Sequence, residues 1–145
     1  MWSGFFGQQC KITPINFEDV QDFINKDKSM YFLINTLPIH NQKYVISGTV
    51  CAQKEEERIN ECLKKNRKNV QILVYGMNCN DITVNKKCND LVALGFTHVK
   101  VYLGGLFEWL LLRDIYGHEL FPLNVGTDTT IEILDYKTPS VNYHQ

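Results

Sequence analysis

The chain has 145 residues, of which 44% are apolar and 21% are charged. These values are typical of one globular domain with a single hydrophobic core. The formal net charge of −1 excludes a general electrostatic attraction to nucleic acid or to an anionic membrane. No apolar run approaches the roughly 20 residues of a membrane-spanning helix, and the first six residues lack the basic start of a secretory signal.

The cysteines number five, an odd count, and no two of them have Cys-x-x-Cys spacing. Free thiols in a reducing compartment are the simplest interpretation, so we expect a cytoplasmic protein. The chain has no two-plus-two ligand cluster of the kind that holds structural zinc. We therefore expect neither a metal site nor a cofactor.

The first part of the chain predicts an arm, an edge strand and a helix. Residues 1–9 are expected to form an N-terminal arm, and residues 11–13 a short edge strand. Asn16 can cap the helix that follows, because its side chain can accept hydrogen bonds from the first free N–H groups. The apolar residues of that helix fall on one face: Phe17, Val20, Phe23 and Ile24.

The middle of the chain alternates between strand and helix patterns. Residues 30–35 and 70–75 are continuous apolar runs, which is typical of strands covered on both faces in a parallel sheet. Short strands are also predicted at 48–51 and 99–103, and helices at 52–66, 82–94 and 106–116. This alternation predicts an α/β fold with right-handed crossovers, a central parallel sheet of five strands, and helices on both faces.

The stretch from residue 70 to residue 112 resembles the rhodanese-like domain, a family of sulfur-transfer enzymes and their inactive relatives. Its pattern is a buried strand, a loop, a helix, Gly-Phe, a second strand and Leu-x-Gly-Gly-x-x-x-Trp. The matching residues are Ile72 to Tyr75, Leu91, Gly95, Phe96, Val99, Val101 to Gly105 and Trp109. The resemblance covers roughly residues 10–116. We expect a rhodanese-like domain over 10–122 and a C-terminal extension over 123–145, in which 127–136 forms an added strand or a surface tail.

The sequence departs from the family pattern at the positions that carry chemistry. The nucleophilic cysteine of the family normally follows the strand directly, where this chain has Gly76. The acid and the arginine that usually follow the earlier strand are replaced by Asn35 and Leu37. Cys79 lies three residues beyond Gly76, near Asp81, which can cap the next helix. The positive end of that helix would favour a thiolate at Cys79.

Two functions follow from the resemblance. The first is a sulfurtransferase of weak activity, with Cys79 as the persulfide-forming nucleophile and a small sulfur donor or thiol acceptor as its partner. The anion- or substrate-binding loop would comprise Gly76, Met77, Asn78, Asn80, Asp81 and Ile82. The second is a catalytically inactive binding or regulatory module with a protein partner. The missing cysteine at residue 76 and the absence of Lys and Arg from the loop favour the second function.

Overall fold

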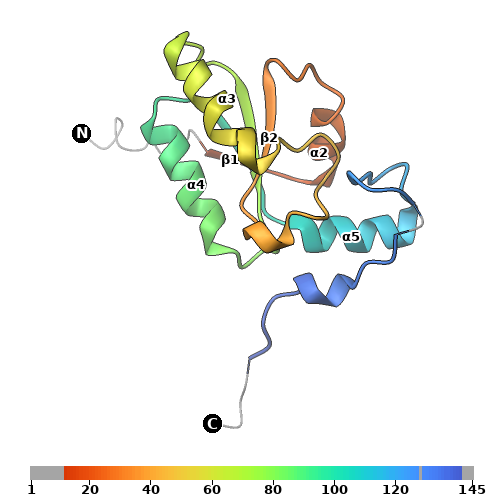
Figure 1. The fold of residues 1–145 in the computed structure, drawn as a ribbon. Helices are drawn as coiled ribbons and strands as arrows, with labels where there is room; N and C mark the ends of the chain where they lie inside the picture. Colours follow the sequence, from red (N-terminus) through yellow and green to blue (C-terminus); the bar gives the residue numbers. More distant parts are fainter. Residues whose placement is uncertain (1–11, 128, 142–145) are drawn as a thin grey trace.

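The computed structural model describes residues 12–127 and 129–141 (Figure 1). The predicted arm over 1–9 lies outside the described residues. The helices and strands, in chain order, are β1 (Ile12–Ile15), α2 (Phe17–Phe23), β2 (Tyr31–Asn35), the 3₁₀ helix η1 (Ile39–Asn41), α3 (Ala52–Lys64), β3 (Gln71–Tyr75), α4 (Ile82–Ala93), β4 (His98–Tyr102), α5 (Gly105–Tyr116) and the 3₁₀ helix η2 (Ile133–Tyr136).

The sheet is parallel throughout and has the strand order β1-β4-β3-β2. It contains four strands among the described residues, so the prediction of five was wrong. The segment 48–51 makes a single bridge, between Thr49 and Leu33, and one bond from Val50 N–H to the Leu33 carbonyl at 2.8 Å. Gly48 turns the chain with a φ of +87° and α3 begins at Ala52, so no second pair can form.

Helices cover both faces of the sheet, as the strand–helix alternation predicted (Figure 1). Successive residues of a strand point to opposite faces. On β2, Leu33 enters the core cluster shared with α2 and α5, while Phe32 and Ile34 enter the cluster shared with α3 and α4. Trp109 of α5 is fully buried in the first cluster, where it anchors the core.

The helix starts follow the capping predictions. The Asn16 side chain accepts hydrogen bonds from the N–H groups of Glu18 and Asp19, and the Asp19 carboxylate accepts the Asn16 N–H in return. Asp81 caps α4 by accepting the Thr83 N–H at 3.0 Å. These local bonds explain why both helix starts could be predicted from sequence.

The chain after residue 122 packs back onto the domain. Leu123 is buried and bridges to Ile46 in antiparallel orientation. Neither part of 127–136 that the structure describes is a strand; its last four residues form η2, and Tyr136 is buried in the α5 face of the core. The predicted surface tail is therefore a segment with a core anchor. Across residues 12–127 and 129–141, no helix combines the length and apolarity needed to cross a bilayer.

Candidate functional site

The loop of residues 76–81 connects β3 to α4 at the carboxyl edge of the sheet. In parallel sheets this edge is the usual place for ligands. The chain leaving β2 and the start of α5 flank the loop. Thr36 donates its backbone N–H to the Tyr75 carbonyl at 3.0 Å. These contacts place the whole predicted loop at one edge, beside two neighbouring elements.

The first turn of α5 holds the backbone of the loop. The N–H groups of Leu106 and Phe107 donate to the carbonyls of Gly76 and Met77, at 2.9 and 2.8 Å. Gly105 has a φ of +69°, and a β-carbon there would lie 2.8 Å from the Asn78 nitrogen. The chain therefore makes a tight turn into α5 at Gly105, where only a residue without a β-carbon fits this close to the backbone of the loop.

Gly76 occupies the position where the family resemblance would place the nucleophilic cysteine. A β-carbon at Gly76 would lie 2.5 Å from Asp81 Oδ2 and 2.5 Å from Val84 Cγ2. Neither atom moves away easily, because Val84 is buried in the core and the Asp81 carboxylate is held by hydrogen bonds. The space that a cysteine side chain would need is therefore filled.

Asp81 serves two backbone segments at once. Its Oδ2 accepts the Met77 N–H at 2.9 Å, and its Oδ1 accepts the backbone N–H and the hydroxyl of Thr83. A loop that binds an anionic sulfur donor needs free N–H groups pointing inward. Here the Met77 N–H is already bound by a carboxylate, and that carboxylate carries the charge that would repel an anion.

Beside the loop is an open cavity of about 310 Å³. Its walls come from the chain after β2, the loop, the start of α4 and the C-terminal segment: Thr36, Pro38, Met77, Asn78, Asn80, Asp81, Ile82, Thr83 and Pro139. Five of the seven predicted site residues thus line one cavity. Of the described residues that line it, Asp81 is the only charged one. The cavity therefore suits uncharged, apolar groups better than anions.

Cys79 and Gly76 are the predicted site residues that do not line this cavity. The Cys79 side chain is exposed to solvent. Cys51 is also exposed, whereas Cys62 and Cys88 are buried. Burial raises the pKa of the Cys88 thiol to about 11, which makes it unreactive near neutral pH. Cys10 lies outside the described residues.

Asn78 has a role that the sequence did not reveal. It is buried, and its side-chain amide donates to the carbonyls of Tyr136 and Lys137 at 2.9 and 3.2 Å. Its Oδ1 accepts the Asn80 N–H at 3.0 Å and shapes the loop. The contact joins residues 58 and 59 positions apart, and no local pattern signals such a partner.

A neutral hydrogen-bond network stands where the family usually has an acid and an arginine. The buried Asn35 Oδ1 accepts the Leu37 N–H at 2.9 Å and the Gln42 amide at 2.8 Å. The Gln42 amide also donates to the Leu37 carbonyl at 2.9 Å. These bonds fix the chain after β2 without any charged side chain, so this neighbouring segment adds no cation to the site.

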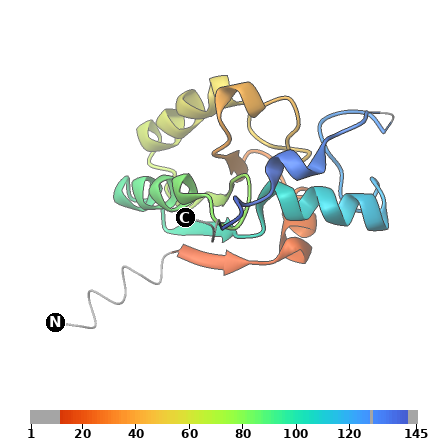
Figure 2. The ribbon, with the colours of Figure 1, turned by 90° about the horizontal axis from the view of Figure 1, so that it is seen from below.

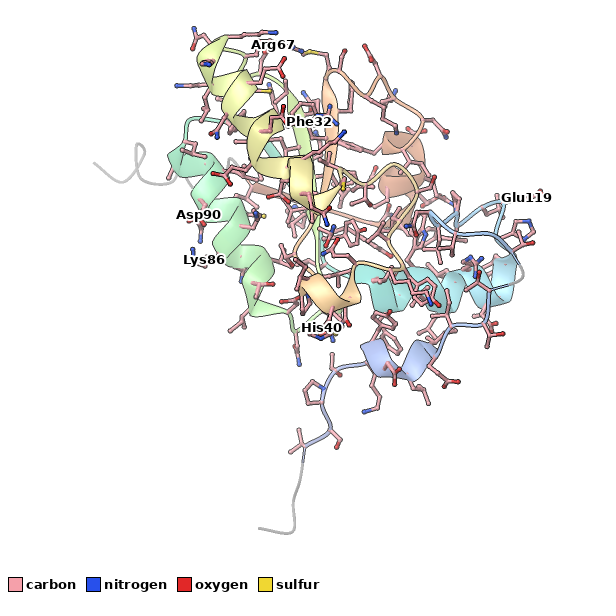
Figure 3. The ribbon with its side chains drawn as sticks, viewed as in Figure 1. Phe32, His40, Arg67, Lys86, Asp90 and Glu119 are labelled. Atoms are coloured by element: carbon pink, nitrogen blue, oxygen red, sulfur yellow. The ribbon has the colours of Figure 1, made fainter. Side chains whose placement is uncertain are left out.

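A second, larger groove of about 670 Å³ runs between α3 and α4. Thr36 and Thr83 line both cavities, and their hydroxyls are hydrogen-bonded at 2.9 Å. The groove contains both carboxylates and lysines, including the ion pair between Lys87 and Glu55. Lys86 and Asp90, labelled on α4 in Figure 3, form another ion pair that lines the groove. This mixture of charges favours no single class of ionic ligand.

Within residues 12–127 and 129–141, no three His, Cys, Asp or Glu side chains are grouped so that they could hold a metal ion. No family model matches the chain. No curated protein matches it either.

Solved structures do match. The crystal structure of the Alr3790 protein from Anabaena sp. is 19% identical to this chain, with a TM-score of 0.55, and the match covers 78% of this chain and 82% of that one. A structure described as the Rhodanese_3-like domain of Alr3790 is 22% identical, with a TM-score of 0.46, over 65% of this chain and 98% of that one. At this level of identity the likeness concerns the fold alone. The chain therefore shares the α/β fold of the Alr3790 protein, one domain of which is described as rhodanese-like.

Proposed function

We propose that this domain is a catalytically inactive rhodanese-like module that binds a protein partner through its loop face. By loop face we mean the surface formed by the loop of residues 76–81, the chain after β2 and the cavity between them. The observation that carries the proposal is the filled position at Gly76. Asp81 and Val84 leave no room there for a β-carbon, and therefore none for the nucleophile that the family uses.

The electrostatics of the loop support the same conclusion. Rhodanese-type donors such as thiosulfate are anions, and their binding requires free N–H groups or cationic side chains. Asp81 binds the Met77 N–H and adds a negative charge, while no described lining residue of the cavity is a lysine or an arginine. An apolar cavity with a carboxylate is better suited to side chains of a protein than to a small anion.

The second candidate is sulfur transfer through Cys79, which its exposure on the loop favours. The Cys79 thiolate would attack the outer sulfur of thiosulfate, and sulfite would leave with the electron pair of the broken sulfur–sulfur bond. Cyanide would then attack the outer sulfur of the resulting persulfide, and thiocyanate would form as the Cys79 thiolate is regenerated. This route needs no room at Gly76, so it must be tested directly.

The test is the transfer of sulfur from thiosulfate to cyanide by the wild-type chain and by Cys79→Ser. Cys51→Ser is the matched control, because Cys51 is the other exposed thiol among the described cysteines. We expect no thiocyanate above the uncatalysed rate for any of the three proteins. Intact-mass spectra after thiosulfate treatment should show no added sulfur atom. Activity or a persulfide that Cys79→Ser abolishes and Cys51→Ser retains would overturn the proposal.

We place the protein in the cytoplasm. The support is chemical: the described cysteines are all free thiols, and two of them are exposed. Exposed free thiols persist in reducing compartments and become oxidised in secreted proteins. Fractionation of cells that express the full chain, with blotting of each fraction, tests the placement.

A further inference from the structure

The end of α3 carries a dense run of positive charge. Four of the five residues from 64 to 68 are lysine or arginine, although the chain as a whole has a net charge of −1. The run connects α3 to β3, so it lies at the amino edge of the sheet, opposite the loop face. Figure 3 shows Arg67 at this end of α3 and His40 of η1 at the other end of the sheet. In Figure 2, α3 lies on the left and α5 on the right, so the run is also distant from α5.

Two arginines are held in place at this edge of the sheet. Arg67 Nη2 donates to the Ser29 carbonyl at 2.9 Å, and Arg58 Nη2 donates to the carbonyl of the preceding residue, Lys28, at 2.8 Å. The Arg58 guanidinium also lies over the Phe32 ring, 4.4 Å from its centroid. The carbonyls of two consecutive residues between α2 and β2 thus orient two guanidinium groups. We define the basic patch by its five cations: Arg58, Lys64, Lys65, Arg67 and Lys68.

The basic patch keeps a net positive charge. Among the described residues, only one ion pair involves the patch, between Lys65 and Glu61 at 2.9 Å. Two more carboxylates border it: Glu57, one turn before Glu61, and Asp27, which accepts the Ser29 N–H at 3.0 Å. Five cations and three carboxylates leave a net charge of +2. Neither arginine forms an ion pair within the described part of the chain, so each keeps N–H groups of its fork for an oxyanion.

The surroundings of the basic patch favour separate carboxylates over a continuous phosphate backbone. Duplex DNA carries about one negative charge per 1.7 Å of its axis, so it would meet the bordering carboxylates as well as the cations. Binding of single strands relies on exposed aromatic rings on which bases stack. The ring within the patch, Phe32, is only 3% exposed and is covered by Arg58. A protein segment, in contrast, places individual carboxylates opposite individual cations.

We infer that the basic patch is a docking surface for an acidic segment of a partner protein. The lysines attract the segment, and Arg58 and Arg67 bind its carboxylates through the N–H groups that their backbone contacts leave free. This inference goes beyond the proposed function, because the patch lies at the opposite edge of the sheet and requires neither the loop of residues 76–81 nor its cavity.

The experiment measures binding of a fluorescein-labelled peptide of alternating glutamate and glycine to the full-length wild-type protein, by anisotropy in about 0.1 M salt. We expect saturable binding with a Kd below about 1 mM, and no binding of the peptide in which glutamine replaces glutamate. Lys64→Gln/Lys68→Gln should bind at least about threefold more weakly, because it removes two cations of the patch. Lys43→Gln/Lys86→Gln removes the same charge elsewhere and should change the Kd by less than about 1.5-fold, since salt screens distant charges. Arg67→Lys keeps the charge but loses the fork, so it should weaken binding at least about twofold.

Three results would overturn the inference. The first is the lack of saturable binding of the glutamate peptide to the wild-type protein. The second is equal weakening by the two lysine pairs, because the attraction would then come from charge in general rather than from the basic patch. The third is tighter binding of a labelled oligothymidylate, or of vesicles of phosphatidylcholine and phosphatidylserine, that Lys64→Gln/Lys68→Gln abolishes. The occupant would then be nucleic acid or a membrane and not an acidic protein segment.

Discussion

The substitution Gly76→Ala tests the filled nucleophile position directly. Gly76 is absent from the residues with positive φ, so its backbone conformation is open to any residue. Where space is available, replacing such a glycine with alanine raises the free energy of unfolding by about 0.4–1 kcal/mol, because the unfolded chain loses entropy. Where space is lacking, overpacking lowers it by about 1–3 kcal/mol. The sign of the change therefore distinguishes an open position from a filled one.

The geometry at Gly76 predicts a loss of stability. The new β-carbon would lie 2.5 Å from both Asp81 Oδ2 and Val84 Cγ2, and real β-carbons do not approach other atoms so closely. If the Asp81 carboxylate moves, its bond to the Met77 N–H is lost at a cost of about 1 kcal/mol. We expect the free energy of unfolding to fall by about 2–3 kcal/mol, from the overpacking and hydrogen-bond terms together.

Urea unfolding followed by circular dichroism gives this value, provided that the slope of the transition is unchanged. Gly104→Ala is the matched control. Gly104 has a φ of −60°, and its added β-carbon meets the side chain of Glu108, whose carboxylate can rotate away. We expect Gly104→Ala to leave stability within about 0.5 kcal/mol of wild type or to raise it slightly.

A second background identifies the contact responsible. In Val84→Ala the Cγ2 atom is missing, so Gly76→Ala should cost less there than in wild type, by about 0.5 kcal/mol or more. If Gly76→Ala is as stable as wild type or more stable, then a side chain fits at residue 76. The physical basis for proposing that this domain is catalytically inactive would then be wrong.

Three further outcomes follow from burial and titration. Trp109→Ala should lower the free energy of unfolding by about 3–5 kcal/mol in urea titrations, because the fully buried indole also donates to a backbone carbonyl at 3.1 Å; a loss below about 1 kcal/mol would contradict its role as a core anchor. Brief iodoacetamide treatment of folded protein should modify Cys79 and Cys51, whereas peptide mapping should find Cys62 and Cys88 modified only after unfolding; early labelling of either buried thiol would refute this. Below pH 9 the Cys88 thiol should not change the free energy of unfolding. Between about pH 9 and 11 it should lower that free energy, because the thiol of the unfolded chain loses its proton near pH 9 whereas burial raises the pKa of the folded thiol to about 11. The loss is on the order of 2 kcal/mol, and Cys88→Ala should flatten this slope in urea titrations at each pH; an unchanged slope would exclude Cys88 as its source.

Local chemistry explains which parts of the fold the sequence could predict. Asn16 and Asp81 cap helices through bonds to residues two or three positions away, so the sequence alone shows both partners. The continuous apolar runs at β2 and β3 identify strands that are covered on both faces. The buried residues of α4, Val84, Cys88 and Leu91, recur with the period of a helix, so the sequence itself shows which face of α4 packs on the core.

The predictions that failed concern segments whose structure depends on whether a distant strand is free to pair with them. Segment 48–51 has strand composition, but a turn before it and the start of α3 after it leave room for one bridge only. Residues 127–136 alternate like a strand, yet the part of this range that the structure describes, 127 and 129–136, pairs with no strand, and Tyr136 is buried against α5 instead. A strand requires a partner edge, and the local pattern does not show whether one is free.

The candidate site likewise has some features that the sequence shows and others that only the tertiary structure shows. The sequence by itself determined that residue 76 is a glycine, that the loop carries no cation, and that Cys79 lies three residues beyond the position where the rhodanese-like resemblance would place a cysteine. Only the tertiary structure decided that Asp81 and Val84 fill the space at Gly76 and that Asn78 holds a segment 58 positions away. The physical reason is that residue identity is fixed along the chain, whereas free volume and hydrogen-bond partners are fixed by packing between segments that are distant in sequence.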